Sequence, residues 1–227
     1  MLVPLRRESF RQIIPLVATG PQYAYYWGKP ADFLQRILIS FVGALILWIC
    51  KIFGPDSLSE LALLFIGITL LYWLWGPVYW ASIRNASYRK YPYSGFWRGE
   101  VCDVFISEEV VREEQTVNKK GELVILETIE KRINIEAVDE SGFKVKTQAP
   151  LRRLFKKIRP GQIAEALILS SRDDLSRIEC ISDLYLPQEN LWVGDYPYLR
   201  RDLFSQMSLQ LASRRESNRR ARYNNIN

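Results

Sequence analysis

Two long apolar runs, residues 33–53 and 61–83, lie close together in the first third of the chain. At about 1.5 Å of rise per residue, each run forms a helix long enough to cross a hydrocarbon core of about 30 Å. A short polar turn at residues 54–60 separates them. Neither run carries an ionisable residue at mid-depth, and Arg36 and Lys51 near the ends can extend to the headgroups. This pattern predicts a transmembrane helical hairpin.

Beyond the second run, the apolar positions fall into short β-branched stretches separated by Gly, Asn and Asp. These stretches occupy residues 101–106, 110–117, 123–137, 143–148, 163–170 and 178–186. Short runs with turn residues between them predict antiparallel hairpins, and five or six of them predict a small antiparallel β-barrel or curled sheet. From Tyr198 onward an apolar stripe at helical spacing predicts a C-terminal helix.

The expected fold class is therefore an α+β membrane protein with four parts. They are a cytoplasmic N-terminal interfacial segment at residues 1–32, the transmembrane hairpin at 33–83, a cytoplasmic β-rich domain at 84–197, and a C-terminal helix with a basic tail at 198–227.

Basic residues crowd the outer ends of the two apolar runs, whereas the turn between the runs carries Asp56 and Glu60. The positive-inside rule then places both termini in the cytoplasm and the turn on the other side. The net charge of +6 favours contact with anionic lipid headgroups over contact with nucleic acid.

Five aromatic rings lie within the nine residues from Tyr72 to Trp80. They are typical of an interfacial aromatic belt, in which amphipathic rings lie at headgroup level. An isolated hairpin offers little surface on which to bury so many rings. A second hypothesis is therefore that Trp73, Trp75, Tyr79 and Trp80 contact a larger membrane protein.

A basic cluster interleaved with Leu, Phe and Ile lies at residues 151–159 and contains Arg152, Arg153, Lys156 and Lys157. Three interpretations remain open for it. It is a solvated surface loop, a site that docks on the membrane or on a partner, or, third, an RNA-binding patch. Each basic residue near an anionic leaflet contributes about 1 kcal/mol to membrane binding.

The chain contains no histidine, which excludes imidazole acid–base chemistry, Ser/His and Cys/His pairs, and His metal sites. The three cysteines have no CxxC spacing, and neither a P-loop nor a dinucleotide fingerprint is present. The sequence therefore identifies no catalytic, cofactor-binding or metal-binding residue, and no small-molecule substrate. We expect a protein that is not an enzyme and has no cofactor.

Several motifs resemble a family of cyanobacterial membrane proteins of unassigned function. They include Tyr72-Trp-Leu-Trp-Gly-Pro77, Tyr93-Ser-Gly-Phe-Trp-Arg-Gly99 and Trp192-Val-Gly-Asp-Tyr-Pro-Tyr-Leu199. Members of that family sometimes carry the label "phosphate ABC transporter permease". Two predicted spans without a polar site in the membrane do not describe a permease. The resemblance implies a photosynthetic organism and a thylakoid location, and it supplies no catalytic residues.

Two functions follow as expectations. The first is a non-enzymatic, membrane-anchored scaffold, such as an assembly or stability factor for a photosynthetic membrane complex. The alternative is an accessory or regulatory subunit of a membrane transporter. The first predicts a larger membrane complex as partner, and the second predicts a separate multi-span permease.

Overall fold

The computed structural model describes residues 1–27, 30–53, 59–117 and 123–224. The chain forms two compact units, each described here by itself. The helical unit is Ile14–Lys90. The β unit combines Met1–Ile13 with Tyr91–Asn227, so the helical unit is an insertion within the chain of the β unit.

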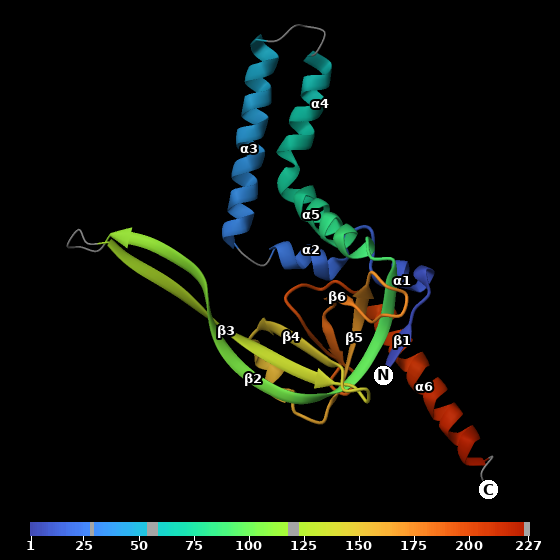
Figure 1. Cartoon of the computed structure of the whole chain (residues 1–227). Helices are drawn as coiled ribbons and strands as arrows, with labels where there is room; N and C mark the ends of the chain where they lie inside the picture. The colour runs from blue at the N-terminus through green and yellow to red at the C-terminus, as the bar shows by residue number, and fades with distance from the viewer. Residues whose placement is uncertain (28–29, 54–58, 118–122, 225–227) are drawn as a thin grey trace. The chain divides into compact units, whose positions relative to one another are not determined.

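The helical unit contains α2 (Gly20–Trp27), α3 (Pro30–Phe53), α4 (Ser59–Leu70) and α5 (Tyr72–Arg89). Helices α3 and α4 lie side by side, and the chain bends sharply before α5 (Figure 1). The angle between Leu61–Leu70 and Tyr72–Arg89 is 76°. At the bend, the backbone N–H of Trp73 donates to Ser40 Oγ of α3 at 3.0 Å. That contact holds the start of α5 against α3.

The predicted two-span hairpin is wrong. Among the helices that the structure describes, α3 alone is long and apolar enough to cross a membrane as a single helix. The second apolar run is two helices, α4 and α5, that meet at the 76° bend. Both helices have the apolar composition expected of one continuous span. Ser40, which fixes the bend, lies 33 positions before Trp73 in the sequence. For that reason the run looked continuous.

The β unit is built on an eight-stranded sheet in which every strand pair is antiparallel. The strand order is β4-β3-β2-β5-β7-β8, with β1 added on β2 and β6 on β5. The strands are β1 (Leu2–Pro4), β2 (Tyr93–Val117), β3 (Leu123–Val138), β4 (Lys144–Pro150), β5 (Ile163–Ser170), β6 (Ile178–Ile181), β7 (Leu184–Leu186) and β8 (Leu191–Val193).

The sheet is open, so the expected barrel or curled sheet is also wrong, although the α+β class holds. Closure of a barrel requires hydrogen bonds between the end strands. Here the path ends at β4 and β8, and these two strands do not pair in the part of the chain that the structure describes. The last strands have only three or four residues, too few to continue the sheet around.

The core of the β unit is formed by buried side chains of the sheet together with residues from α1, η2 and α6. Trp97, Ile135 and Leu184 are among its fully buried residues. Phe204 of α6 (Arg201–Asn224) stacks on Phe96 with ring centroids 5.5 Å apart. α1 (Arg7–Ile13) contributes buried Phe10, and the short 3-10 helix η2 (Arg153–Lys157) contributes Phe155.

Candidate membrane and partner interface

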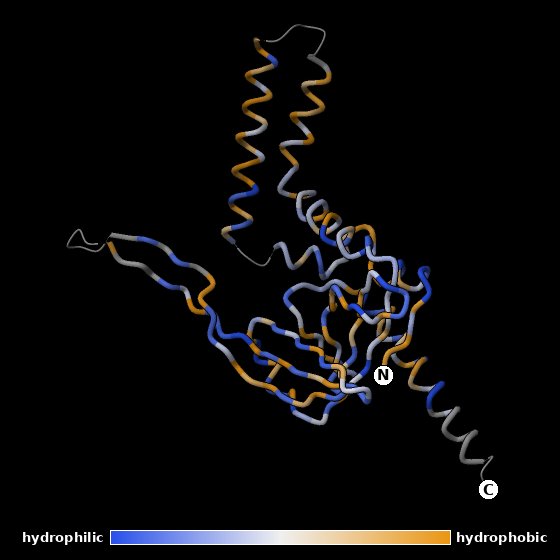
Figure 2. The backbone as a smooth tube through the Cα atoms, viewed as in Figure 1, coloured by the Kyte–Doolittle hydropathy of each residue, from blue (hydrophilic) through white to orange (hydrophobic). Residues whose placement is uncertain are grey.

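Most residues along α3 and α4 are hydrophobic (Figure 2), and many of their large apolar side chains are exposed. Leu34, Leu38 and Phe41 on α3 are each more than 60% exposed, and Leu64 on α4 is 60% exposed. Soluble proteins rarely expose a continuous apolar surface that extends along two helices. This surface is therefore the candidate membrane-contacting surface of the chain.

Two polar residues of α3, Arg36 and Ser40, are turned away from that surface, whereas Asp32 and Gln35 in its first turns are exposed. Arg36 is only 7% exposed and donates from Nη2 to the carbonyl oxygen of Tyr26 at 2.7 Å. Its guanidinium lies 5.9 Å from the ring centroid of Trp27, a cation–π distance. Ser40 Oγ in turn donates to the carbonyl oxygen of Arg36 at 2.9 Å. Arg36 is thus held inside the helical unit, whereas the sequence predicted that its side chain extends to the headgroups.

A second polar contact joins α2 to α5. Gln22 Nε2 donates to Asn85 Oδ1 at 2.9 Å, and Asn85 Nδ2 donates back to Gln22 Oε1 at 2.9 Å. Both residues have no exposed surface. Sequence reasoning missed this pair, because two amides 63 positions apart give no periodic signal.

Replacing Gln22 with leucine should destabilise the helical unit by about 1–3 kcal/mol, because the Asn85 amide would remain buried without its partner. Replacing both Gln22 and Asn85 with leucine should recover part of that loss, since neither amide then leaves the other without its partner, although the Thr19 N–H loses its acceptor Gln22 Oε1 in both variants. Thermal unfolding of the two single variants and the double variant in detergent measures the effect. Strictly additive losses would contradict the paired geometry.

The structure separates the four aromatic residues that the sequence grouped together. Trp73 faces inward and meets the rings of Trp27 and Phe33 at 6.1 Å each. Trp75, Tyr79 and Trp80 are 38–50% exposed and form a row of edge-to-face contacts along α5. These three residues are called the aromatic row below.

The indole N–H groups of the aromatic row have partners within the unit. Trp75 Nε1 donates to the carbonyl oxygen of Ile68 at 2.9 Å, and Trp80 Nε1 donates to the Tyr72 hydroxyl at 3.0 Å. A tryptophan whose N–H is already bonded needs no water or headgroup at that atom. The two tryptophans of the aromatic row can therefore lie against an apolar surface, whereas the Tyr79 hydroxyl needs an acceptor there.

The basic cluster of the sequence lies on and beside η2 in the β unit. Phe155 and Ile158 anchor it in the core at 4% and 6% exposed. Arg152, Arg153, Lys156 and Lys157 are all exposed, and Leu154 among them is 61% exposed. Within the described residues, Lys157 forms an ion pair with Glu189 at 3.7 Å. The arrangement is an exposed cationic surface with one apolar side chain near its centre.

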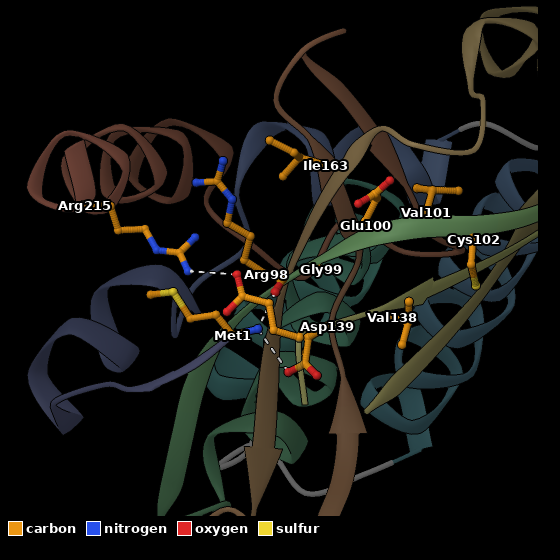
Figure 3. A pocket seen from close by; sticks show the side chains of 11 residues that line it. Met1, Arg98, Gly99, Glu100, Val101, Cys102, Val138, Asp139, Ile163 and Arg215 are labelled. Carbon is orange, nitrogen blue, oxygen red and sulfur yellow. Dashed lines mark hydrogen bonds and ion pairs between the residues drawn. The ribbon is translucent and has the colours of Figure 1, made fainter. Parts of the chain in front are cut away.

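The β unit also contains a cavity of about 540 Å³ (Figure 3). Several charged groups at its edge are paired with one another. The Met1 ammonium lies 3.0 Å from Asp139 and Arg215 lies 3.8 Å from Glu140. Burial opposes ionisation of Asp139, but hydrogen bonds, first that from Ser141, outweigh it and lower the pKa of Asp139 to about 2. These pairs join the turn after β3 to the N-terminus and to α6, which is a structural role.

Two more carboxylates are buried beneath α6. Burial raises the pKa of Asp183 to about 7, against the opposing influence of the Arg201 guanidinium. Burial likewise raises the pKa of Glu165, whose nearest cation is Arg98 at 3.5 Å. Among the described residues, no group of three or more His, Cys, Asp or Glu side chains is arranged to hold a metal ion.

The sequence model of DUF8619, a family of unknown function, matches residues 3–218, so the chain belongs to this family. No curated protein and no solved structure matches the chain.

Proposed function

We propose that this protein is a non-enzymatic, membrane-anchored scaffold in which the helical unit is the anchor and the β unit carries the rest of the function. The observation that carries the proposal is the surface of α3 and α4. Its apolar side chains face outward, and Arg36 and Ser40 are turned inward. That distribution suits a hydrocarbon environment, where polar groups must find partners within the protein.

The connectivity of the chain restricts how the anchor enters the membrane. Residues on both sides of the helical unit, Met1–Ile13 and Tyr91–Asn227, belong to one folded unit. The chain must therefore enter and leave the anchor on the same side. α3 has 24 residues, or about 36 Å, whereas α4 has 12 residues, or about 18 Å. We infer an anchor in which two helices of unequal length, α3 and α4, are inserted from one side of the membrane.

The charge of the flanking residues suggests which side this is. Arg6, Arg7 and Arg11 precede the anchor, and Arg89 and Lys90 end it. The positive-inside rule favours a cytoplasmic position for segments with this charge. The resemblance to cyanobacterial proteins adds the thylakoid membrane to the proposal.

The aromatic row is the surface that we assign to the partner of the scaffold, a larger membrane protein complex. Its two indole N–H groups are bonded internally, so in contact with a partner helix the Tyr79 hydroxyl is the donor of the row that needs an acceptor from the partner. Trp73 takes no part in this contact, because its ring packs against Trp27 and Phe33.

Native gel electrophoresis of mildly solubilised membranes tests the proposal. The tagged chain should migrate with a complex much larger than itself, and mass spectrometry should identify subunits of a photosynthetic complex. Replacing Trp75, Tyr79 and Trp80 with alanine should shift the chain to low mass while it stays in the membrane. Tyr25→Ala is the matched control, because Tyr25 is a similarly exposed ring, 41%, on α2.

Migration of the wild-type chain alone would contradict the scaffold. Co-migration with a multi-span permease and its ATPase would favour the transporter subunit instead. If the triple variant stays in the complex, the aromatic row contacts lipid and the partner binds elsewhere.

A further inference from the structure

Strands β2 and β3 extend well beyond the rest of the sheet. β5 pairs with β2 only along Tyr93–Glu100, and β4 pairs with β3 only along Arg132–Val138. Beyond these limits, residues 107–117 of β2 and 123–131 of β3 pair with each other alone among the described strands (Figure 1). This two-stranded ribbon is called the arm below. Isolated ribbons of this kind are marginally stable in water, so the arm needs a surface that covers it.

One face of the arm continues the core face of the sheet. Lys131 and Glu127 lie on this face opposite Glu108 and Glu113, so charged cross-strand pairs alternate there with apolar ones. On β3, Ile133 and Ile135 face the core and are 2% and 1% exposed. Side chains two residues apart share a face, so Ile129 and Leu123 continue the same face outward, at 55% and 72% exposed. Val110 of β2 lies directly opposite Ile129 and is 48% exposed. The core face thus extends past the domain without a cover.

The same arm is acidic, although the chain as a whole has a net charge of +6. The sequence of its two strands contains six glutamates against Arg112 and Lys131; the glutamates are Glu108, Glu109, Glu113, Glu114, Glu127 and Glu130. An acidic arm is repelled by an anionic leaflet, which argues against lipid as its cover.

Two pairs of glutamates lie directly opposite each other across the arm. Glu109 and Glu130 share the guanidinium of Arg132, at 3.4 and 3.5 Å. Glu113 and Glu127 also lie opposite each other, and the structure records no ion pair for either among the residues it describes. Like charges directly opposite destabilise a ribbon. The pair Glu113–Glu127 therefore marks the place where a cation from another molecule would stabilise the arm.

The basic cluster on η2 has the complementary character. Its exposed cations surround the exposed side chain of Leu154, and Phe155 and Ile158 hold it rigidly on the core. A surface with an apolar centre and a cationic edge is complementary to a ribbon face on which the apolar pair Val110–Ile129 is followed by the acidic pair Glu113–Glu127. Within one chain the two lie apart, since Phe155 and Ile158 hold η2 on the core of the sheet, whereas the arm extends beyond the strands that form this core.

We propose that the arm docks on the basic cluster of a second copy of this chain, so that two copies exchange arms in a symmetric dimer. Each arm then packs Val110 and Ile129 against Leu154 of the other copy, and the neighbouring Glu113 and Glu127 meet Arg153 and Lys156. Contact between the two arms themselves is disfavoured, because it would bring their glutamates together. This dimer involves the β unit only and goes beyond the scaffold role proposed above.

The mass of the purified full-length chain in detergent micelles, measured by light scattering over a dilution series, tests the dimer. The wild type should be dimeric at high concentration. Glu113→Lys with Glu127→Lys should weaken the dimer by about tenfold or more, and Arg153→Glu with Lys156→Glu should do the same. All four substitutions in one chain should restore it, because the charges are then exchanged between the two surfaces.

The matched control is Lys144→Glu with Arg172→Glu, which reverses two exposed charges elsewhere on the β unit and should leave the dimer unchanged. The arm variant keeps two like charges opposite each other, so a change in its own folding is not expected to cause the loss. A monomeric wild type would overturn the proposal and leave the arm to a different basic protein. A fourfold variant no tighter than either double variant would also overturn it.

Discussion

Replacing Gly99 with alanine is expected to destabilise the β unit by about 3 kcal/mol, the upper part of the usual range for overpacking a core. A Cβ atom at Gly99 would lie 2.5 Å from the ring of Trp97 and 2.5 Å from the carbonyl oxygen of Val138. Trp97 is fully buried, and the Val138 carbonyl oxygen is part of the backbone of β3, so neither neighbour can move away without a large energetic cost. Whole domains are stable by only about 5–15 kcal/mol.

Chemical unfolding of the full chain in detergent, followed by near-ultraviolet circular dichroism, measures this loss. Gly67→Ala on α4 is the control, because no atom lies within 4 Å of the Cβ it would add. Equal stability of Gly99→Ala and the wild type would contradict the packing of β2 against β3 at this point.

Two lysines in the middle of α3 are expected to release the chain from the membrane. Val42 and Leu45 are 43% and 42% exposed, so Val42→Lys with Leu45→Lys disturbs little of the packing within the helical unit. In a bilayer the same change should oppose insertion by about 5 kcal/mol or more, since each lysine at a helix centre costs about 2.5–3.5 kcal/mol. Alkaline extraction of membranes, followed by immunoblotting, measures the fraction released.

The control keeps the spacing of three residues and places the lysines on α6, as Gln206→Lys with Leu209→Lys, where both positions are exposed. This variant should remain with the membrane as the wild type does. Equal retention of the α3 variant would mean that the surface of α3 and α4 does not lie in lipid.

The sequence predicted the elements of this chain better than their arrangement. Strand pattern and helical spacing reveal which segments are strands and helices, because these depend on neighbours along the chain. The bend before α5 depends on Ser40 of another helix, and the burial of Arg36 depends on Tyr26 and Trp27. Contacts of this kind leave no local pattern.

The candidate interface shows the same limit. The basic residues on η2 were expected as a cluster, and they do share an exposed surface. The aromatic group was expected to act together, whereas a helix that presents Trp75 and Tyr79 outward necessarily turns Trp73 toward α3. The arm was divided in the sequence at residues 107–109, because the glutamates there interrupted the apolar pattern of what is one continuous strand.

Labelling of single cysteines in sealed membrane vesicles tests the central claim most directly, that the helical unit is an anchor inserted from one side. Cys50 near the end of α3 and Cys102 in β2 are both exposed in the fold. Glu8→Cys adds a thiol at an exposed position of α1. Each would be the only cysteine, with the others replaced by serine. A membrane-impermeant maleimide should label Cys102 and Glu8→Cys from the same side, and should reach Cys50 from that side only after detergent is added. Labelling of Cys50 as fast as Cys102 in intact vesicles, or labelling of Cys102 and Glu8→Cys from opposite sides, would contradict the account.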